Sequence, residues 1–332
     1  MRFMVLVAQT VAAMFVTLIV ADVVVRWTFP HTPRLNENFS AAYLQRAIRE
    51  DHLSDKIVVI GDSALWGYRV KPQEAAIARL SSSSVQFENL SFEGGSPANL
   101  YALLRLMQAD GIRPKAVLFN VNLKEFNAAD SAYQTLYPGL EQLVWQQLRP
   151  EERSLLKPTR HATFDARADA TLGSFWALYG MRADIREQLF GTPDAVTALR
   201  DQIESLSGET ARAGAAHVPS PDKFMGTYDL SPLSGTNVEV IFLKKSVSLL
   251  QAEHIPTIAI LTPTNHGLLH DYIDTPDYGD QLAYVSALLR EHGARVLNYD
   301  RAFRPDEFFD NDHLTVAGNE HLSALLRKDL RL

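Results

Sequence analysis

Cysteine is absent from the 332-residue sequence, which excludes disulfide bonds, thiolate metal sites and a cysteine nucleophile. A nucleic-acid partner is not indicated either, because the formal net charge is -7. The sequence also lacks a Gly-x-x-x-x-Gly-Lys phosphate loop. No partners at metal-ligand spacing accompany four histidines, His254, His266, His270 and His292. We therefore expect a protein that uses no metal or other cofactor and binds no nucleic acid.

A long apolar segment lies at the N-terminus. Residues 3–25 are apolar apart from Asp22 and three uncharged polar residues, and a helix of about 20 residues crosses a bilayer. A cleaved signal peptide is the alternative, but the segment ends in Asp-Val-Val-Val-Arg-Trp, which is a poor cleavage site. The sequence predicts an uncleaved transmembrane anchor at residues 1–26, followed by a linker and a short helix at residues 27–54.

Downstream of this segment, short apolar runs alternate with helical patterns. The expected strands lie at residues 56–60, 85–90, 116–121, 257–261 and 295–297. Such alternation predicts a parallel sheet that helices cover on both faces. We therefore predict a doubly wound, flavodoxin-like α/β domain at residues 55–332 with about five parallel strands. A functional site in such a sheet lies at the carboxyl ends of the strands.

One stretch interrupts the alternation. Residues 128–236 contain helical pieces, such as residues 139–148, but no convincing buried strand. We predict that this stretch is an inserted, mostly helical cap.

A Gly-Asp-Ser tripeptide at residues 61–63 directly follows the first predicted strand. A serine on a tight strand-to-helix turn exposes its hydroxyl at the edge of the sheet, where a base can reach it. The backbone N–H of Ser63 can also serve in an oxyanion hole. The alternative is that the aspartate or serine merely caps a helix, and the tripeptide alone favours that alternative.

Near the C-terminus, Asp310 precedes His313 by three residues. In a single helical turn this spacing lets the carboxylate accept a hydrogen bond from the imidazole and leaves the other ring nitrogen free as a base. The alternative is that Asp310 or Asp312 caps the final helix and that His313 has no catalytic role.

Two further segments end the second and third predicted strands. Gly94 and Gly95 close the first of them, where glycine allows close backbone approach to a ligand, and Asn122 closes the other. Backbone N–H groups and an asparagine amide are the donors that an oxyanion hole needs. Alternatively, the glycines form only a turn and the asparagine only a loop.

Taken in sequence order, these four segments resemble the GDSL or SGNH hydrolase superfamily, whose four named residues are Ser, Gly, Asn and His. The matching residues are Ser63, Gly94 (with Gly95 as the alternative), Asn122, and Asp310 with His313. The resemblance covers about residues 55–127 and 237–332. It implies a catalytic triad of the serine, the histidine and the aspartate. It also implies an oxyanion hole made by the N–H groups of the serine and the glycine with the asparagine amide.

The sequence departs from that family in its third block, where Asn120 replaces the usual glycine and Leu123 the usual aspartate. With the predicted anchor and cap, the chain is similar to the membrane-anchored branch that includes alginate and cellulose O-acetylation proteins and the D-alanylation protein of teichoic acid synthesis. That resemblance implies transfer of an acetyl or D-alanyl group to a cell-envelope polymer, with a membrane-bound O-acyltransferase as partner. It also implies a single-pass protein of the cytoplasmic membrane, with the catalytic domain on the exported side. A hydrolytic esterase or deacetylase and a non-catalytic polymer-binding assembly protein are the alternatives.

Overall fold

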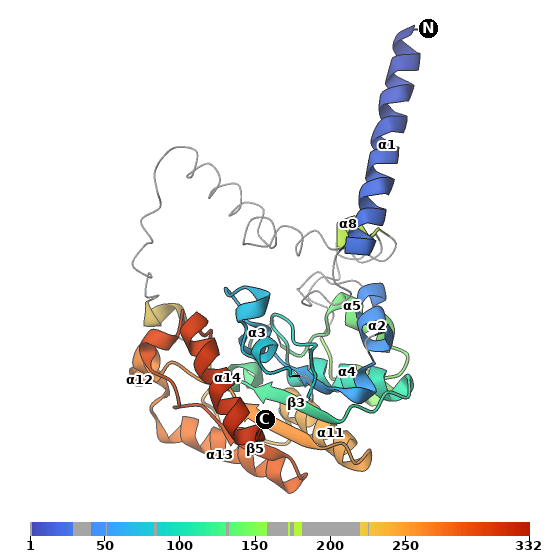
Figure 1. The fold of residues 1–332 in the computed structure, drawn as a ribbon. Coiled ribbons are helices and arrows are strands. Elements are labelled where there is room, and N and C mark those ends of the chain that lie inside the picture. The colour runs from blue at the N-terminus through green and yellow to red at the C-terminus, as the bar shows by residue number, and fades with distance from the viewer. Residues whose placement is uncertain are drawn as a thin grey trace, which may run out of the picture.

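The computed structural model describes residues 2–28, 41–50, 52–82, 85–130, 133–157, 172, 176–180, 220–224 and 226–332. Within these residues a five-stranded sheet forms the centre of the molecule, and helices surround it (Figure 1).

The sheet is parallel throughout and has the strand order β2-β1-β3-β4-β5. Its strands are β1 (Ile57–Ile60), β2 (Phe87–Asn89), β3 (Ala116–Val121), β4 (Thr257–Leu261) and β5 (Arg295–Asn298). This order is the flavodoxin-like one, in which the chain changes direction across the sheet between β1 and β3. The prediction of a doubly wound sheet of five parallel strands is confirmed.

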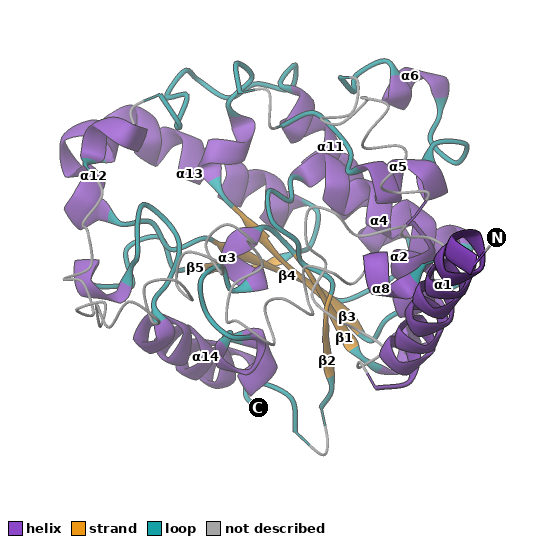
Figure 2. Ribbon diagram, turned by 90° about the horizontal axis from the view of Figure 1, so that it is seen from above, coloured by secondary structure: helices purple, strands orange, loops and turns teal. Residues whose placement is uncertain are grey.

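Alternate residues of the strands pack on opposite faces of the sheet, as the pleat requires. On β3, Val117 and Phe119 belong to a core with helices α4 (Pro97–Ala109), α11 (Val238–Ala252) and α13 (Pro276–Glu291). Leu118 belongs to a second core on the other face, which α14 (Val316–Leu330) covers. Figure 2 shows these two helical layers on either side of the strands.

Several other described helices are shorter. They are α2 (Ala41–Glu50), α3 (Ser63–Trp66), α5 (Pro138–Val144), α6 (Pro150–Arg153), α8 (Ala177–Gly180) and α12 (His266–Ile273). Short 3-10 helices lie at η1 (Leu53–Asp55), η2 (Pro72–Glu74), η3 (Ile77–Arg79), η4 (Leu123–Phe126), η5 (Pro221–Phe224) and η6 (Pro305–Glu307). The described part of the predicted cap, residues 128–236, is helical where it is regular. Most of that cap lies outside the described residues.

Helix α1 (Arg2–Thr28) occupies the predicted N-terminal segment and extends away from the sheet (Figure 1). Near its C-terminal end the Asp22 carboxylate accepts a hydrogen bond from the backbone N–H of Leu178, at 2.8 Å. In the part of the chain that the structure describes, no helix combines the length and the apolar character needed to cross a membrane. The helix that we predicted is therefore present, but the structure does not support its transmembrane character.

Candidate active site

The turn after β1 places Ser63 at the carboxyl edge of the sheet. Asp62 caps α3, because its Oδ1 accepts from the backbone N–H of Ala64 at 2.9 Å, and Ser63 is the first residue of that helix. A Cβ on Gly95 would collide with the carbonyl oxygen of Gly61, so glycine permits the close contact between the two loops. Asp62 thus has the capping role that we considered as the alternative, and this cap fixes the start of the helix that carries Ser63.

The segment that carries Asp310 and His313 is a bend and not the helical turn that we expected. A backbone hydrogen bond from Phe309 N–H to His313 O, at 2.8 Å, closes this bend. The cap of α14 is Thr315, whose hydroxyl accepts from the N–H of Gly318 at 3.2 Å, so neither aspartate caps this helix. The predicted helical turn and the alternative capping role of the aspartates are therefore both wrong, although the predicted contact between Asp310 and His313 forms.

The structure brings Ser63, His313 and Asp310 together in one hydrogen-bonded chain. Ser63 Oγ lies 2.8 Å from His313 Nε2, and His313 Nδ1 lies 2.9 Å from both carboxylate oxygens of Asp310. The ring of Tyr68 packs against the imidazole with a centroid distance of 4.4 Å. A serine, a base and an orienting carboxylate in this order are the parts of a nucleophilic triad.

Electrostatics favour an ionised carboxylate beside the histidine. Burial raises the pKa of Asp310, but the hydrogen bond and charge of His313 outweigh it and lower the pKa to about 2. Burial lowers the pKa of His313, but the charge of Asp312 and the hydrogen bond that His313 donates to Asp310 raise it above its ordinary value of 6.5. Asp310 is therefore ionised at neutral pH, where it holds the imidazole in one orientation.

A second, buried network lies beside this chain. Asp312 Oδ2 accepts from the amide nitrogen of Asn122 at 2.6 Å and also contacts the ammonium group of Lys124. Burial raises the pKa of Asp312, but the charge of Lys124 lowers it below its ordinary value. The other oxygen, Oδ1, lies 3.5 Å from His313 Nδ1 and has no hydrogen-bond partner among the described residues. Asp312 is thus an anion that faces both the lysine and the histidine.

The predicted oxyanion donors lie in different environments. Gly95 N–H donates to Phe92 O at 3.1 Å, whereas the N–H groups of Ser63 and Gly94 have no acceptor in the described parts of the chain. Gly94 has a φ of 68°, which favours glycine. Of the two glycines, Gly94 is the one with a free donor. Its role in an oxyanion hole remains a prediction.

An oxyanion donor needs a free N–H group, but the side-chain amide of Asn122 already has acceptors. Its amide nitrogen donates to Asp312 Oδ2 and, at 3.1 Å, to Asp62 Oδ2, so two carboxylates take both amide hydrogens. A developing oxyanion would have to compete with these two carboxylates. The predicted oxyanion role of Asn122 therefore also remains a prediction.

Three polar residues of the site were not identified from the sequence. Asn120 accepts from Asp62 N–H at 3.0 Å and donates to Asp62 Oδ1 at 2.7 Å, so it clamps the turn that precedes Ser63. Lys124 and Asp312 form the buried pair described above. Their positions carried a signal: Lys124 follows Asn122 by two residues, Asp312 precedes His313 by one, and Asn120 is the departure from the family's glycine.

Asp310, Asp312 and His313 also have potential metal-ligand atoms within 4.8 Å of one another. Asp310 and His313 already form a hydrogen bond with each other, and the ammonium of Lys124 contacts Asp312. The chemistry of this donor set therefore fits a hydrogen-bonded triad better than a cation site, because a cation would compete with the lysine for Asp312.

No protein-family model matches the sequence, and no curated protein matches it either. Among solved structures, a protein from Desulfitobacterium hafniense DCB-2 that is assigned to the G-D-S-L family of lipolytic proteins is similar, with 13% sequence identity and a TM-score of 0.39. The alignment covers 82% of this chain and 98% of that chain. A similarity at this level carries no argument of its own, so any inference of function depends on the site residues.

Proposed function

We propose that this chain is a serine-dependent acyl-ester enzyme of the SGNH type that forms an acyl intermediate on Ser63. The observation that carries this proposal is the hydrogen-bonded chain from Ser63 Oγ through His313 to Asp310, with contacts of 2.8 and 2.9 Å. It lies at the carboxyl edge of a parallel sheet, next to the point where the strand order reverses.

The mechanism follows from these contacts. His313 Nε2 takes the hydroxyl proton of Ser63 while Oγ attacks the carbonyl carbon of an ester or thioester. Asp310 remains ionised and stabilises the imidazolium that forms. The oxyanion accepts hydrogen bonds from the free N–H groups of Ser63 and Gly94. When this intermediate collapses, the imidazolium returns its proton to the leaving group and the acyl group stays on the serine.

In the second half of the reaction, His313 removes a proton from an acceptor hydroxyl, which attacks the carbonyl carbon of the acyl-serine. The bond from this carbon to Ser63 Oγ then breaks, and the imidazolium of His313 returns the proton to Oγ. We propose that this acceptor belongs to a cell-envelope glycan or polymer and that the acyl group is acetyl or D-alanyl. Support comes from the departures at Asn120 and Leu123, which separate the sequence from the usual third block of the hydrolases that it resembles.

We also propose that α1 attaches the chain to the cytoplasmic membrane, with the catalytic domain on the exported side and an acyl donor supplied by a membrane-bound O-acyltransferase. Large apolar side chains of α1 are exposed to solvent, among them Met14, Phe15 and Ile19, at 60–65% of their area. Such a surface is unfavourable in water and favourable in lipid. Salt-washed membranes should retain the full chain and lose a chain that starts at His31; release of both by salt would contradict the attachment.

The proposed reaction can be tested with a chromogenic acetyl ester, with and without a soluble glycan acceptor. An acyltransferase should release the chromophore and acetylate the acceptor, which mass spectrometry detects. Chromophore release with free acetate as the only acyl product would identify a hydrolase. Failure of both chromophore release and labelling of Ser63 by a fluorophosphonate would refute the acyl-enzyme.

A further inference from the structure

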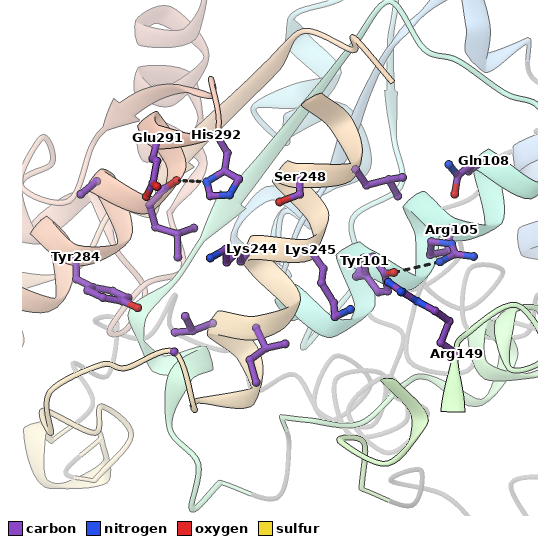
Figure 3. A pocket seen from close by; sticks show the side chains of 16 residues that line it. Tyr101, Arg105, Gln108, Arg149, Lys244, Lys245, Ser248, Tyr284, Glu291 and His292 are labelled. Carbon is purple, nitrogen blue, oxygen red and sulfur yellow. Dashed lines mark hydrogen bonds between the residues drawn. The ribbon is translucent and has the colours of Figure 1, made fainter. Parts of the chain in front are cut away.

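A cavity of about 770 Å³ lies among helices α4, α11 and α13 and shares none of its lining residues with the candidate active site. Four basic side chains line it, whereas one acidic side chain, Glu291, does so. The basic residues are Arg105, Arg149, Lys244 and Lys245. Figure 3 shows Arg105, Arg149 and Lys245 gathered around Tyr101, with Glu291 at the opposite side of the pocket.

A buried carboxylate balances two of these cations. Glu152 is fully buried, and its carboxylate lies 3.0 Å from Lys245 Nζ and 3.2 Å from Arg149 Nη2. It also accepts from the hydroxyl of Tyr101 at 2.7 Å. Arg149 Nε also lies 3.4 Å from a carboxylate oxygen of Glu151, so two carboxylates balance these two cations. The excess positive charge around the pocket therefore depends on Arg105 and Lys244.

The other two cations have no carboxylate partner within the described ranges of the chain. Lys244 is exposed and forms no ion pair there. Arg105 donates only to neutral oxygens, the Tyr101 hydroxyl at 3.2 Å and the Gln147 carbonyl at 3.0 Å. Its Nε–H is buried without an acceptor. No carboxylate of the described residues therefore neutralises the Arg105 charge, and an anionic group in the pocket would complement it.

We propose that this pocket binds an anion that carries several carboxylate or phosphate groups, at a site separate from Ser63. Several cations spread over one open cavity complement a ligand with several negative groups better than a single small anion. Arginine provides paired donors that suit planar or tetrahedral oxyanions, and lysine adds an unpaired point charge. The ring of Tyr101 lies between Arg105 and Lys245, whose charged groups are 6.0 and 5.9 Å from its centroid. Tyr284 lines the pocket on the side of Glu291 (Figure 3).

Isothermal titration calorimetry on the full chain at low salt tests this proposal with two probes, inorganic tripolyphosphate and trigalacturonate. We expect saturable binding of at least one probe, and the probe that binds identifies phosphate or carboxylate as the recognised group. Lys244→Ala should weaken binding about three- to five-fold, the effect of one partly exposed charge pair. Arg105→Gln should weaken it about ten-fold, because a charge-assisted hydrogen bond is lost.

The matched control is Lys328→Ala, because Lys328 is an exposed lysine on α14, outside the pocket. Its affinity should equal that of the unsubstituted chain, and so should the affinity of Ser63→Ala. The proposal is overturned if neither probe binds saturably, or if Lys328→Ala loses as much affinity as Lys244→Ala, which would indicate attraction to the whole surface. Loss of binding in Ser63→Ala would place the ligand at the candidate active site and would overturn the proposal of a separate anion site.

Discussion

The candidate active site has two halves that differ in how their charges are balanced. The reacting half contains Ser63, His313 and Asp310, and its single carboxylate faces the imidazole. The supporting half contains a buried ion pair, Lys124 with Asp312, whose carboxylate also accepts from an asparagine amide. A buried ion pair seldom adds stability compared with apolar packing, although removal of one partner is costly. The difference suggests that the first half performs the chemistry and that the second half sets the position and pKa of the histidine.

Removal of the nucleophile should have the largest effect. We expect Ser63→Ala to lower ester turnover by roughly 10⁴-fold to 10⁶-fold, because a triad without its nucleophile retains only residual catalysis. Ser286→Ala is the matched control, since Ser286 is as buried as Ser63 (6% against 5% exposed) but lies on α13. Circular dichroism checks that both variants fold. Full turnover by a folded Ser63→Ala variant would show that the reacting half does not perform the chemistry.

The two aspartates beside His313 should differ in their effect on turnover. Asp310→Asn should lower turnover by about 10³-fold to 10⁴-fold, because an amide orients the wrong imidazole tautomer. Asp312→Asn should cost about 10-fold to 100-fold, the range expected when a catalytic group is displaced but retained. Steady-state kinetics with the same ester compares them. A larger loss for Asp312→Asn would make Asp312 the triad carboxylate and would reverse the assignment of the two halves.

Local patterns predicted the reacting half better than the supporting half. Four of the five strands lie within the predicted apolar runs, and β5 ends one residue beyond its run. Buried strands of a parallel sheet are rich in apolar residues, which makes such runs visible in the sequence. The Asp310–His313 contact was also predictable, since the two residues are close in sequence. The ion pair of Lys124 and Asp312 joins residues 188 positions apart, and no local pattern specifies such a pairing.

The conformation of the histidine segment could not be predicted for the same reason. Asn265 donates from its side chain to Asp310 O at 2.9 Å and from its backbone to Asn311 O at 2.8 Å. These contacts come from a distant part of the chain and favour a bend over a helical turn. Asn265 also caps α12, a short helix that the sequence analysis did not identify.

The pH dependence of turnover should distinguish the halves through the histidine. His313 must be neutral to act as a base, and its pKa is raised above 6.5, so turnover should increase as the pH rises through a midpoint above 6.5. Asp312→Asn removes the charge that raises this pKa and leaves Lys124, which lowers it, so the midpoint should move to lower pH. The double variant Lys124→Met with Asp312→Asn should have a midpoint between that of the unsubstituted chain and that of Asp312→Asn. An unchanged midpoint in Asp312→Asn would show that the supporting half does not tune the base.

The smallest effect on turnover is expected at Asn120, which belongs to the supporting half through its clamp on Asp62. In Asn120→Ala the N–H of Asp62 loses its acceptor, and the hydroxyl of Thr262 loses a donor at 2.8 Å. Lost buried hydrogen bonds of this kind should lower the free energy of unfolding by about 2–4 kcal/mol. Turnover should fall only about three- to ten-fold, because the Asp62 cap on Ala64 N–H still holds the start of α3.

Thr262→Val is the matched control for this clamp, since it removes the hydroxyl that Asn120 contacts and leaves the Asn120–Asp62 bonds in place. It should cost about 1 kcal/mol of unfolding free energy and leave turnover nearly unchanged. Urea denaturation and ester kinetics measure the two quantities on the same preparations. If a folded Asn120→Ala variant lost as much turnover as Asp310→Asn, the clamp would belong to the reacting half. If Asn120→Gly, which restores the residue usual in the resembled superfamily, kept both stability and turnover, the clamp would have no structural role.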